Sequence, residues 1–160
     1  MELVEKAKQF ATRAHGDQKY GNDKPYTWHL EKTAEFARRL GYADEVVAAC
    51  WLHDTAEDTS VTLDELRAEF PAVVVDAVAA VTFTGASGED KLAKALSHLI
   101  GHVVKFCDAS VNYSATVIYG APAGKDQWEF SIHRYLSYLE VLKQHLPTPQ
   151  EIQDFLSGQH

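Results

Sequence analysis

The groups best suited to chemistry are concentrated in residues 53–58, His-Asp-Thr-Ala-Glu-Asp, which directly follow an apolar run. Imidazoles and carboxylates are costly to bury unless a cation or a catalytic role compensates for their lost hydration. On a continuous α-helix, residues four apart share a face, which would stack His53 with Glu57. The same spacing would place Asp54 beside Asp58. The stretch therefore predicts a functional site at the end of a helix, against the alternative of a solvated acidic helix end.

Two distant residues extend this set: His29 near the expected start of a helix, and Asp108 at the end of an apolar run. Taken singly, a histidine is more often a surface or satisfied core residue, and an aspartate is usually solvated or a helix cap. Together with His53 and Asp54, they supply two imidazoles and two carboxylates. Such a set suits borderline divalent metals such as Mn²⁺, Fe²⁺ or Zn²⁺ and leaves positions open for water.

Composition limits the classes of protein that this chain can form. Its 160 residues are enough for one domain with a substantial core. The net charge of -8 argues against nonspecific nucleic-acid binding. We expect no transmembrane segment and no signal peptide, because no apolar stretch has the required length or position. Cys50 and Cys107 lie in apolar surroundings without a disulfide framework, which favours a reducing cytoplasm. The oligomeric state stays open.

Helical periodicity dominates the chain and predicts an all-α domain over residues 1–160. The expected helices cover residues 2–14, 27–40, 44–57, 62–70, 72–82, 91–112 and 128–145, with a last short helix after Thr148. Thr62 with Glu65 forms a capping-box pattern. Residues 15–25, 84–89 and 120–124 are expected to be loops because they are rich in glycine and polar residues. A break at Gly101 would divide the helix of residues 91–112 into two.

Three further histidines are expected to have structural roles. His15 follows the first helix and is expected to fix the next loop through a hydrogen bond to a backbone carbonyl, against a direct role in the site. His98 and His102 share a helical face, which invites a second metal site. However, no carboxylate lies at matching spacing, so a structural or surface role is favoured.

The motifs that surround these residues narrow the interpretation. In order along the chain they are Ala14-His15-x-x-Gln18, Pro25-Tyr26-x-x-His29, Leu52-His53-Asp54-Thr55-x-Glu57-Asp58-Thr59, Val81-Thr82 and Val104-Lys105-x-x-Asp108-x-x-x-Asn112. This series resembles the H…HD…D pattern of the HD-domain metal-dependent phosphohydrolases. It is most similar to the hydrolase domain of the stringent-response synthetase/hydrolases and to the free-standing small alarmone hydrolases. The resemblance covers about residues 4–145 and implies a single HD-domain helical bundle.

The resemblance also implies a reaction and a role for each matching residue. The implied activity is removal of the 3′-pyrophosphate from the guanosine alarmones ppGpp and pppGpp by attack of a metal-activated water. The implied ligands of one Mn²⁺ ion are His29, His53, Asp54 and Asp108. Glu57 and Asp58 would form the catalytic acidic pair that positions and deprotonates the water. Asn112 would lie at the nucleotide end of the pocket, and Lys105 would support the phosphates or the acidic pair.

The chain departs from the family pattern in the loop before Pro25. Tyr20 and Gly21 stand where the family carries an Arg-Lys pair that meets the base and the phosphates. Ala109 replaces the basic residue that usually follows the last ligand. Tyr20 could stack on a base, and Lys24 could replace a missing charge, so both are expected to bind substrate.

These departures leave two alternatives open. One is an HD hydrolase that acts on another phosphorylated nucleotide, such as an adenosine alarmone or NADPH. The other is a non-catalytic nucleotide-sensing module that keeps the HD fold. The complete ligand and acidic set argues against the second alternative, because a sensor does not need every water-activating residue. In either case the expected partner is a small nucleotide, with neither nucleic acid nor membrane.

Overall fold

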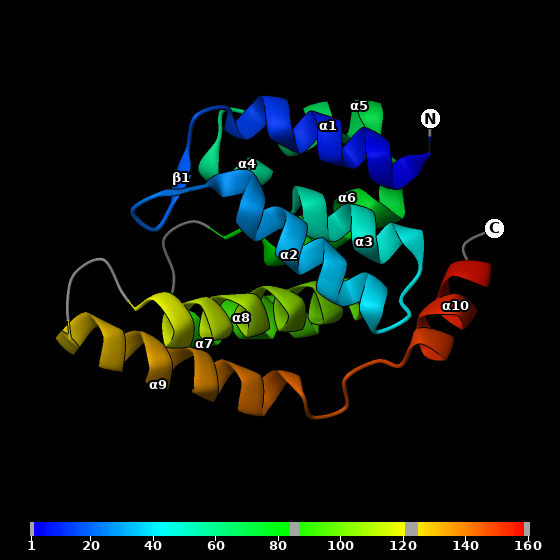
Figure 1. Ribbon diagram of the computed structural model, residues 1–160. Helices are drawn as coiled ribbons and strands as arrows, with labels where there is room; N and C mark the ends of the chain where they lie inside the picture. Colours follow the sequence, from blue (N-terminus) through cyan, green and yellow to red (C-terminus); the bar gives the residue numbers. More distant parts are fainter. Residues whose placement is uncertain (1, 84–86, 121–124, 159–160) are drawn as a thin grey trace.

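Helices make up nearly all of the regular structure in the computed structural model, which describes residues 2–83, 87–120 and 125–158 (Figure 1). The helices are α1 (Leu3–His15), α2 (Tyr26–Arg39), α3 (Asp44–Leu52), α4 (Thr55–Asp58), α5 (Leu63–Glu69), α6 (Ala72–Val81), α7 (Gly88–Leu96), α8 (Leu99–Tyr119), α9 (Lys125–Leu142) and α10 (Pro149–Ser157). Strands β1 (Lys19–Tyr20) and β2 (Lys24–Pro25) form a small antiparallel hairpin. The all-α prediction is confirmed, and the hairpin is an addition within the loop expected over residues 15–25.

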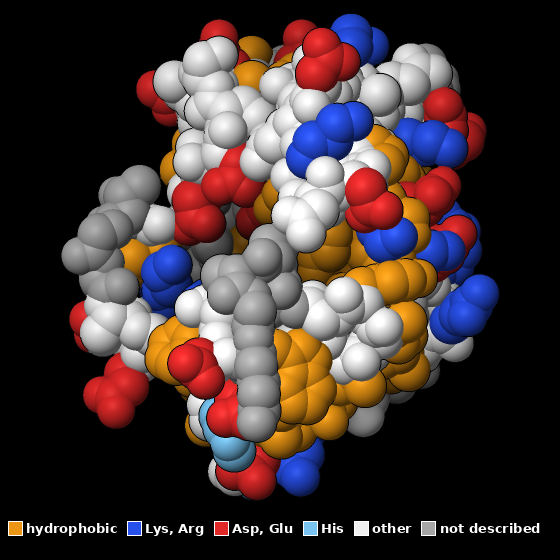
Figure 2. Space-filling view, turned by 60° about the vertical axis from the view of Figure 1, so that its left-hand side comes forward, with side chains coloured by type: hydrophobic (Ala, Val, Ile, Leu, Met, Phe, Trp, Pro, Cys, Tyr) orange, Lys and Arg blue, Asp and Glu red, His pale blue; other side chains and the backbone are white. Residues whose placement is uncertain are grey.

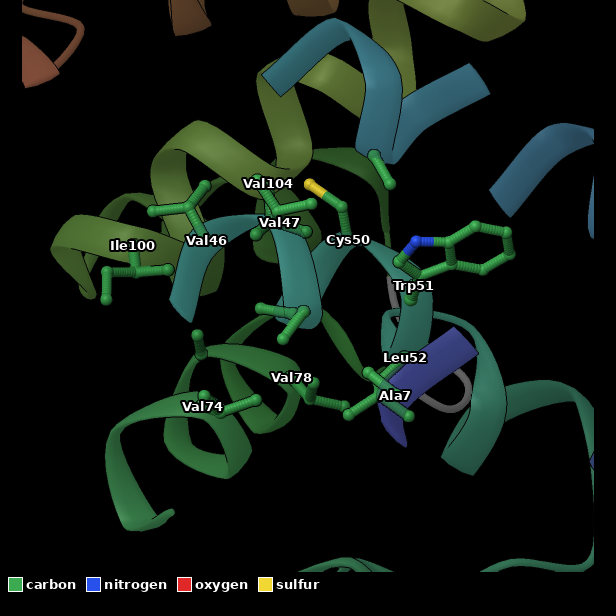
Figure 3. Packing of buried hydrophobic residues seen from close by; sticks show 14 of the residues in the cluster. Ala7, Val46, Val47, Cys50, Trp51, Leu52, Val74, Val78, Ile100 and Val104 are labelled. Atoms are coloured by element: carbon green, nitrogen blue, oxygen red, sulfur yellow. The ribbon is translucent and has the colours of Figure 1, made fainter. Parts of the chain in front are cut away.

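Helix α3 lies at the centre of the packing. Its seven successive residues Val46 to Leu52 are all buried, and it contacts α1, α2, α6 and α8. Figure 3 shows its side chains between those of α6, such as Val78, and those of α8, such as Val104. A helix that is apolar on every side must be surrounded by protein. Burying each large aliphatic side chain contributes about 1.5–3 kcal/mol, so this helix supports the whole bundle.

The central helix is shorter than the sequence predicted. It ends at Leu52; His53 and Asp54 form a turn, and the short helix α4 follows. The imidazole Nδ1–H of His53 donates to the carbonyl oxygen of Cys50 at 2.6 Å. In a continuous helix, that carbonyl would accept from the backbone N–H four residues later. The prediction of a continuous helix over residues 44–57 is therefore wrong, because the side chain of His53 bonds the Cys50 carbonyl at the end of α3.

Local capping signals were reliable where the sequence carried them. The predicted capping box of Thr62 and Glu65 is present at α5, and Thr148 with Glu151 forms another at α10. Helix α2 instead begins at Tyr26 without a side-chain cap, so the Thr27 start is wrong by one residue.

The boundaries around α8 differ more from the prediction. The chain breaks between α7 and α8 at Ser97 and His98, and Gly101 lies inside α8. The Nδ1 atom of His98 accepts from the backbone N–H of Gly101 at 3.1 Å, so His98 caps α8. Helix α8 continues to Tyr119 rather than ending near Asn112. Parts of the two loops predicted over residues 84–89 and 120–124 lie outside the described residues.

The surface carries both charged and apolar areas. Figure 2 brings the hairpin side forward and shows acidic and basic side chains close together at its left, with hydrophobic surface at its lower right. Exposed large apolar residues include Val117, Ile118 and Tyr119 on α8 and Phe130 on α9. Among the described residues, no helix is long and apolar enough to cross a membrane.

The central position of α3 predicts a large stability difference between two leucines. Leu52 is fully buried, whereas Leu136 on α9 is 39% exposed. We expect Leu52→Ala to lower the free energy of unfolding by about 2–5 kcal/mol, because it leaves a cavity. Leu136→Ala is the matched control and should cost much less. Urea unfolding followed by circular dichroism measures both, and equal losses would contradict the central role of α3.

Candidate metal and catalytic site

Four of the predicted site residues come together from three separate parts of the fold. His29 lies in the first turn of α2, His53 and Asp54 form the turn between α3 and α4, and Asp108 lies in the middle of α8. One possible ligand atom from each lies within 4.8 Å of those of the other three. Three of them are nearly inaccessible, at 1% exposure for His29, 2% for His53 and 6% for Asp108. Asp54 is partly exposed at the edge. We call these four side chains the His/Asp cluster.

Both carboxylates face both imidazoles. Oδ1 of Asp108 lies 3.0 Å from Nε2 of His29 and 3.4 Å from Nε2 of His53. Oδ2 of Asp54 lies 3.0 Å from Nε2 of His53 and 3.7 Å from Nε2 of His29. The four side chains therefore direct two nitrogens and two oxygens at one common space.

The ring of His53 is oriented for such a role. Because its Nδ1–H donates to the carbonyl of Cys50, a neutral imidazole has its free lone pair on Nε2. That Nε2 atom is buried and makes no hydrogen bond to the described residues, although it faces two carboxylates. A metal-binding histidine commonly donates its other ring nitrogen to a carbonyl in this way.

Neighbouring donors fix the carboxylates. The hydroxyl of Tyr26 donates to Oδ2 of Asp54 at 2.7 Å. Lys105 Nζ donates to Oδ2 of Asp108, and Asn112 Nδ2 donates to Oδ1 of Asp108, each at 2.9 Å. Sequence analysis gave Tyr26 no role, although its place in the motif before His29 was a signal for one. Lys105 and Asn112, which were predicted to bind substrate, contact Asp108 in this structure.

The cluster also shifts the ionisation of its members. Burial opposes a charged His53, but the Asp54 and Asp108 carboxylates outweigh it and raise the pKa of His53 well above its ordinary value. Burial likewise opposes charged carboxylates, yet the charge of His53 holds the pKa of Asp54 at about 2. Lys105 and the two imidazoles lower the pKa of Asp108 well below its usual range. A cation entering the cluster would compete with the proton on His53.

These features fit a divalent metal ion. The cluster offers two imidazole nitrogens and two carboxylate oxygens, the mixed donor set that borderline metals favour. The unpartnered Nε2 of His53 points into it, and Tyr26, Lys105 and Asn112 already hold the carboxylates in place. The residues therefore have both the ligands and the supporting contacts of a metal site.

Glu57 and Asp58 lie differently with respect to the cluster. A small cavity of about 20 Å³ is lined by His53, Asp54, Glu57, Val81, Lys91, Val104, Lys105 and Asp108. Oε1 of Glu57 accepts from the backbone N–H of Phe83 at 2.8 Å, which leaves its other oxygen free to face the cavity. Asp58 has a solvent-accessible side chain and does not line the cavity; partial loss of hydration and the charge of Asp54 raise its pKa. Lys91 was missed by sequence analysis because no motif marks it.

A larger cavity of about 270 Å³ lies beside the hairpin. Its lining is Tyr20, Gly21, Asn22, Asp23, Lys24, Asn112, Ala115, Thr116, Tyr119, Gly120, Ser131 and Tyr135. Tyr20 and Lys24, both predicted to bind substrate, therefore share one cavity with Asn112. The Nζ atom of Lys24 lies 4.0 Å from the ring centroid of Tyr119 and 5.1 Å from that of Trp28. Burial and nearby ionisable groups raise the pKa of Tyr20, so its hydroxyl keeps its proton.

Three of the six histidines outside the cluster make contacts that suit the predicted structural roles, although His15 bonds a side chain rather than the expected backbone carbonyl. His15 stacks on Tyr26, with ring centroids 4.8 Å apart, and bonds the side chain of Gln18 through Nδ1. His98 caps α8, and Nε2–H of His102 donates to the carbonyl of Leu142 at 2.6 Å.

Comparison with known sequences places the chain in a family. The profile of the HD domain matches residues 7–98, more than half of the chain, so the protein belongs to the HD domain family. The matched segment contains His29, His53 and Asp54, whereas Asp108 lies beyond it.

Individual relatives match about half of the chain. A guanosine-3′,5′-bis(diphosphate) 3′-pyrophosphohydrolase of Aquifex aeolicus is 37% identical over 84 residues, which cover 52% of this chain and 12% of that protein. A GTP pyrophosphokinase of Streptomyces coelicolor is 38% identical over 79 residues, 49% of this chain and 9% of that protein. The chain therefore spans about a tenth of the length of these curated relatives.

Two solved structures share the fold. One, described as a metazoan ortholog of SpoT that hydrolyzes ppGpp, superposes with a TM-score of 0.75 at 18% identity and covers 98% of this chain and 95% of that one. A Listeria monocytogenes protein has a TM-score of 0.57 at 25% identity, over 76% of this chain and 84% of that one. The first match extends the similarity in fold over nearly the whole chain.

The cluster predicts that divalent metal stabilises the fold. A ligand that binds only the folded state stabilises it by mass action, and the free energy of unfolding rises by about 2.7 kcal/mol at a hundredfold excess of ligand over Kd. The melting temperature rises as a result. We expect Mn²⁺ to raise the melting temperature and EDTA to reverse the change. Asp54→Asn should lose this response, because it replaces a ligand. A wild-type melting temperature that is insensitive to both Mn²⁺ and EDTA would contradict the prediction.

Proposed function

We propose that this protein is a metal-dependent phosphohydrolase that removes the 3′-pyrophosphate from guanosine alarmones, ppGpp and pppGpp. The observation that carries the proposal is the buried His/Asp cluster with Glu57 beside it and two lysines around the same small cavity. The relative from Aquifex aeolicus and the metazoan structure, both described as acting on ppGpp, support this substrate.

The ion in this proposal is Mn²⁺, held by His29, His53, Asp54 and Asp108. The chemistry that such an ion supplies when bound is the acidification of water and the polarisation of a phosphoryl oxygen. The protein's own contribution is to hold the ligand set rigidly, through the Cys50 carbonyl on one histidine and Tyr26 on one carboxylate. Without those contacts, the ligands would have to be ordered at the moment of binding.

Glu57 is the proposed general base. Its Oε1 is engaged by the N–H of Phe83, so the other carboxylate oxygen is left to accept a proton from water. The water oxygen forms a bond to the phosphorus that carries the 3′ oxygen, and the bond between that phosphorus and the 3′ oxygen breaks. The 3′ oxygen takes up a proton, and ppGpp plus water gives GDP plus pyrophosphate. In this assignment, Asp58 is the second member of the acidic pair and acts through its charge beside Asp54, since it does not line the small cavity.

The two cavities suit the two ends of a nucleotide. Lys91 and Lys105 line the small cavity and offer positive charge to phosphates. The larger cavity, with Tyr20, Lys24 and Asn112, has the volume and aromatic surface for a base and a sugar. The phosphates would then lie over the cluster, with the nucleoside beside the hairpin.

A second candidate substrate is favoured by the lining of the larger cavity. The Arg-Lys pair of the resembling family is absent, and Lys24, the cavity's single basic residue among those described, lies over the rings of Tyr119 and Trp28. ppApp carries the same phosphates as ppGpp, but the adenine base of ppApp or NADPH lacks the guanine O6 acceptor that a basic side chain would bind. The non-catalytic sensor is not favoured, because the ligand set and Glu57 are both in place.

The compartment and partner follow from the same proposal. A nucleotide alarmone is an intracellular metabolite, and we propose a reducing cytoplasm as the setting. Cys50 and Cys107 are both free and buried in the core, which suits a reducing environment.

Replacing Glu57 tests the assignment of the base. Glu57→Gln keeps an oxygen for the N–H of Phe83 but removes the proton acceptor, so turnover should fall by about 10²–10⁴-fold. The stabilisation by Mn²⁺ should remain, since Glu57 is not a ligand. Glu89→Gln, on the exposed surface of α7, is the matched control. Full activity of Glu57→Gln would show that the base is another residue.

A substrate screen tests the proposed reaction. The purified protein with Mn²⁺ should release pyrophosphate from ppGpp, and EDTA should abolish the release. Charge-assisted contacts to phosphate are worth about 1.5–3 kcal/mol each. The KM of this protein for ppGpp should therefore be more than tenfold higher than that of an enzyme that carries the Arg-Lys pair. Assays with ppApp and NADPH in parallel decide between the two candidates. A low-micromolar KM for ppGpp would show that other groups replace the missing pair.

A further inference from the structure

The two histidines of the cluster are held in different ways. The ring of His53 is fixed by its hydrogen bond to the Cys50 carbonyl. Nδ1 of His29 is buried and has no hydrogen-bond partner among the described residues. The hydrogen bond of the His29 ring is therefore made at Nε2, to Oδ1 of Asp108 at 3.0 Å inside the cluster. Nothing bonded at Nδ1 helps to set the plane of this ring, although its Nε2 must point at the same space as that of His53.

An aromatic side chain from the hairpin takes this role. The ring of Tyr20, at the end of β1, stacks face to face on His29, with centroids 4.7 Å apart and planes 3° from parallel. Such a stack permits sliding but resists tilting of either ring. Trp28 and Tyr26 flank Tyr20 at 5.4 Å and 6.1 Å, so the tyrosine is itself confined by aromatic neighbours.

The hydroxyl of Tyr20 reaches a second member of the cluster through Asn112. It donates to Oδ1 of Asn112 at 2.7 Å, and Nδ2 of Asn112 donates to Oδ1 of Asp108 at 2.9 Å. The direction is fixed, because an ionised carboxylate only accepts, so the amide nitrogen must face it. The amide oxygen then faces Tyr20, which has a proton to give. Two well-formed bonds thus lead from the hairpin to Asp108.

We propose that Tyr20 is a positioning residue of the metal site, which sets the ring of His29 by stacking and the carboxylate of Asp108 through Asn112. This inference rests on the metal site of the proposed function, and it assigns Tyr20 a role other than contact with the nucleotide base. The hairpin of residues 19–25 thereby becomes a part of the site. Substitution of this one hairpin residue should therefore change the affinity of the site for metal.

Metal titration of the metal-free protein tests this role without any substrate. Tyr20→Phe keeps the stack and loses the hydroxyl, whereas Tyr20→Leu loses both. Changes to groups that orient metal ligands typically cost about 10–100-fold in affinity, and we expect that range for Tyr20→Leu. Tyr20→Phe, which keeps the stack, should weaken Mn²⁺ binding by about 3–10-fold, below that range. Isothermal titration calorimetry with Mn²⁺ gives each Kd.

The matched control is Tyr113→Phe. Tyr113 lies on the same helix as Asn112, is half-buried, and makes no hydrogen bond among the described residues. Its Kd for Mn²⁺ should equal that of the wild type. The circular dichroism spectra of all variants should overlay that of the wild type. If Tyr20→Leu unfolds, the conservative variant Tyr20→Phe still tests the proposal.

Kinetics separates positioning from substrate contact. At low Mn²⁺ the rate of Tyr20→Phe should fall below that of the wild type, and it should rise again as Mn²⁺ is raised, whereas loss of a nucleotide contact would raise KM for ppGpp at every Mn²⁺ concentration. An unchanged Kd for Mn²⁺ in Tyr20→Phe and Tyr20→Leu, with a raised KM for ppGpp, would overturn the proposal. If the wild type binds Mn²⁺ but hydrolyses no ppGpp, the substrate assignment fails and the Kd series still tests Tyr20. A wild type that binds no Mn²⁺ would overturn both.

Discussion

Two carboxylates and two imidazoles share a space from which water is nearly excluded, and this electrostatic constraint shapes the molecule. Asp54 and Asp108 bring two negative charges, and Lys105 contacts only one of them. Charged groups taken out of water must be balanced by opposite charge and by hydrogen bonds. Without metal, a protonated His53 supplies part of the balance, in agreement with its raised pKa. A divalent cation would supply it more completely.

The fold meets this constraint with rigid elements that are far apart in sequence. Helix α3 is buried on all sides, so the turn that follows it has little freedom to move. Helices α2 and α8 pack against α3 and against each other, and each carries one member of the cluster. Asp108 lies near the middle of the 21-residue α8 rather than at its frayed end. The cluster is therefore set by backbone packing before any ligand is bound.

Some of this arrangement could be predicted from sequence because its causes are local. Helical periodicity, the capping box of Thr62 and Glu65, and the acidic and imidazole groups after an apolar run are all visible within a few residues. The break at His53 was not predicted, because it depends on a buried imidazole competing for the Cys50 carbonyl. From sequence alone, a continuous helix was the simpler interpretation.

The supporting contacts were the hardest to predict because they join distant segments. The hairpin is held by Tyr20, whose partners His29 and Asn112 lie 9 and 92 residues away along the chain. Lys91, which lines the small cavity, and the Phe83 N–H, which bonds Glu57, belong to no motif. Tyr26 belongs to a motif, but nothing in the sequence showed that it donates to Asp54. Sequence thus indicated the ligand set, whereas the network that orients it became visible only in three dimensions.

The central claim is that His29, His53, Asp54 and Asp108 form one metal site. Crystals grown with Mn²⁺ and measured near the manganese absorption edge test it most directly. The account predicts one anomalous peak in the cluster, about 2.0–2.3 Å from a nitrogen or oxygen of each side chain. Full-occupancy manganese elsewhere on the protein, with no peak between His53 and Asp108, would contradict it.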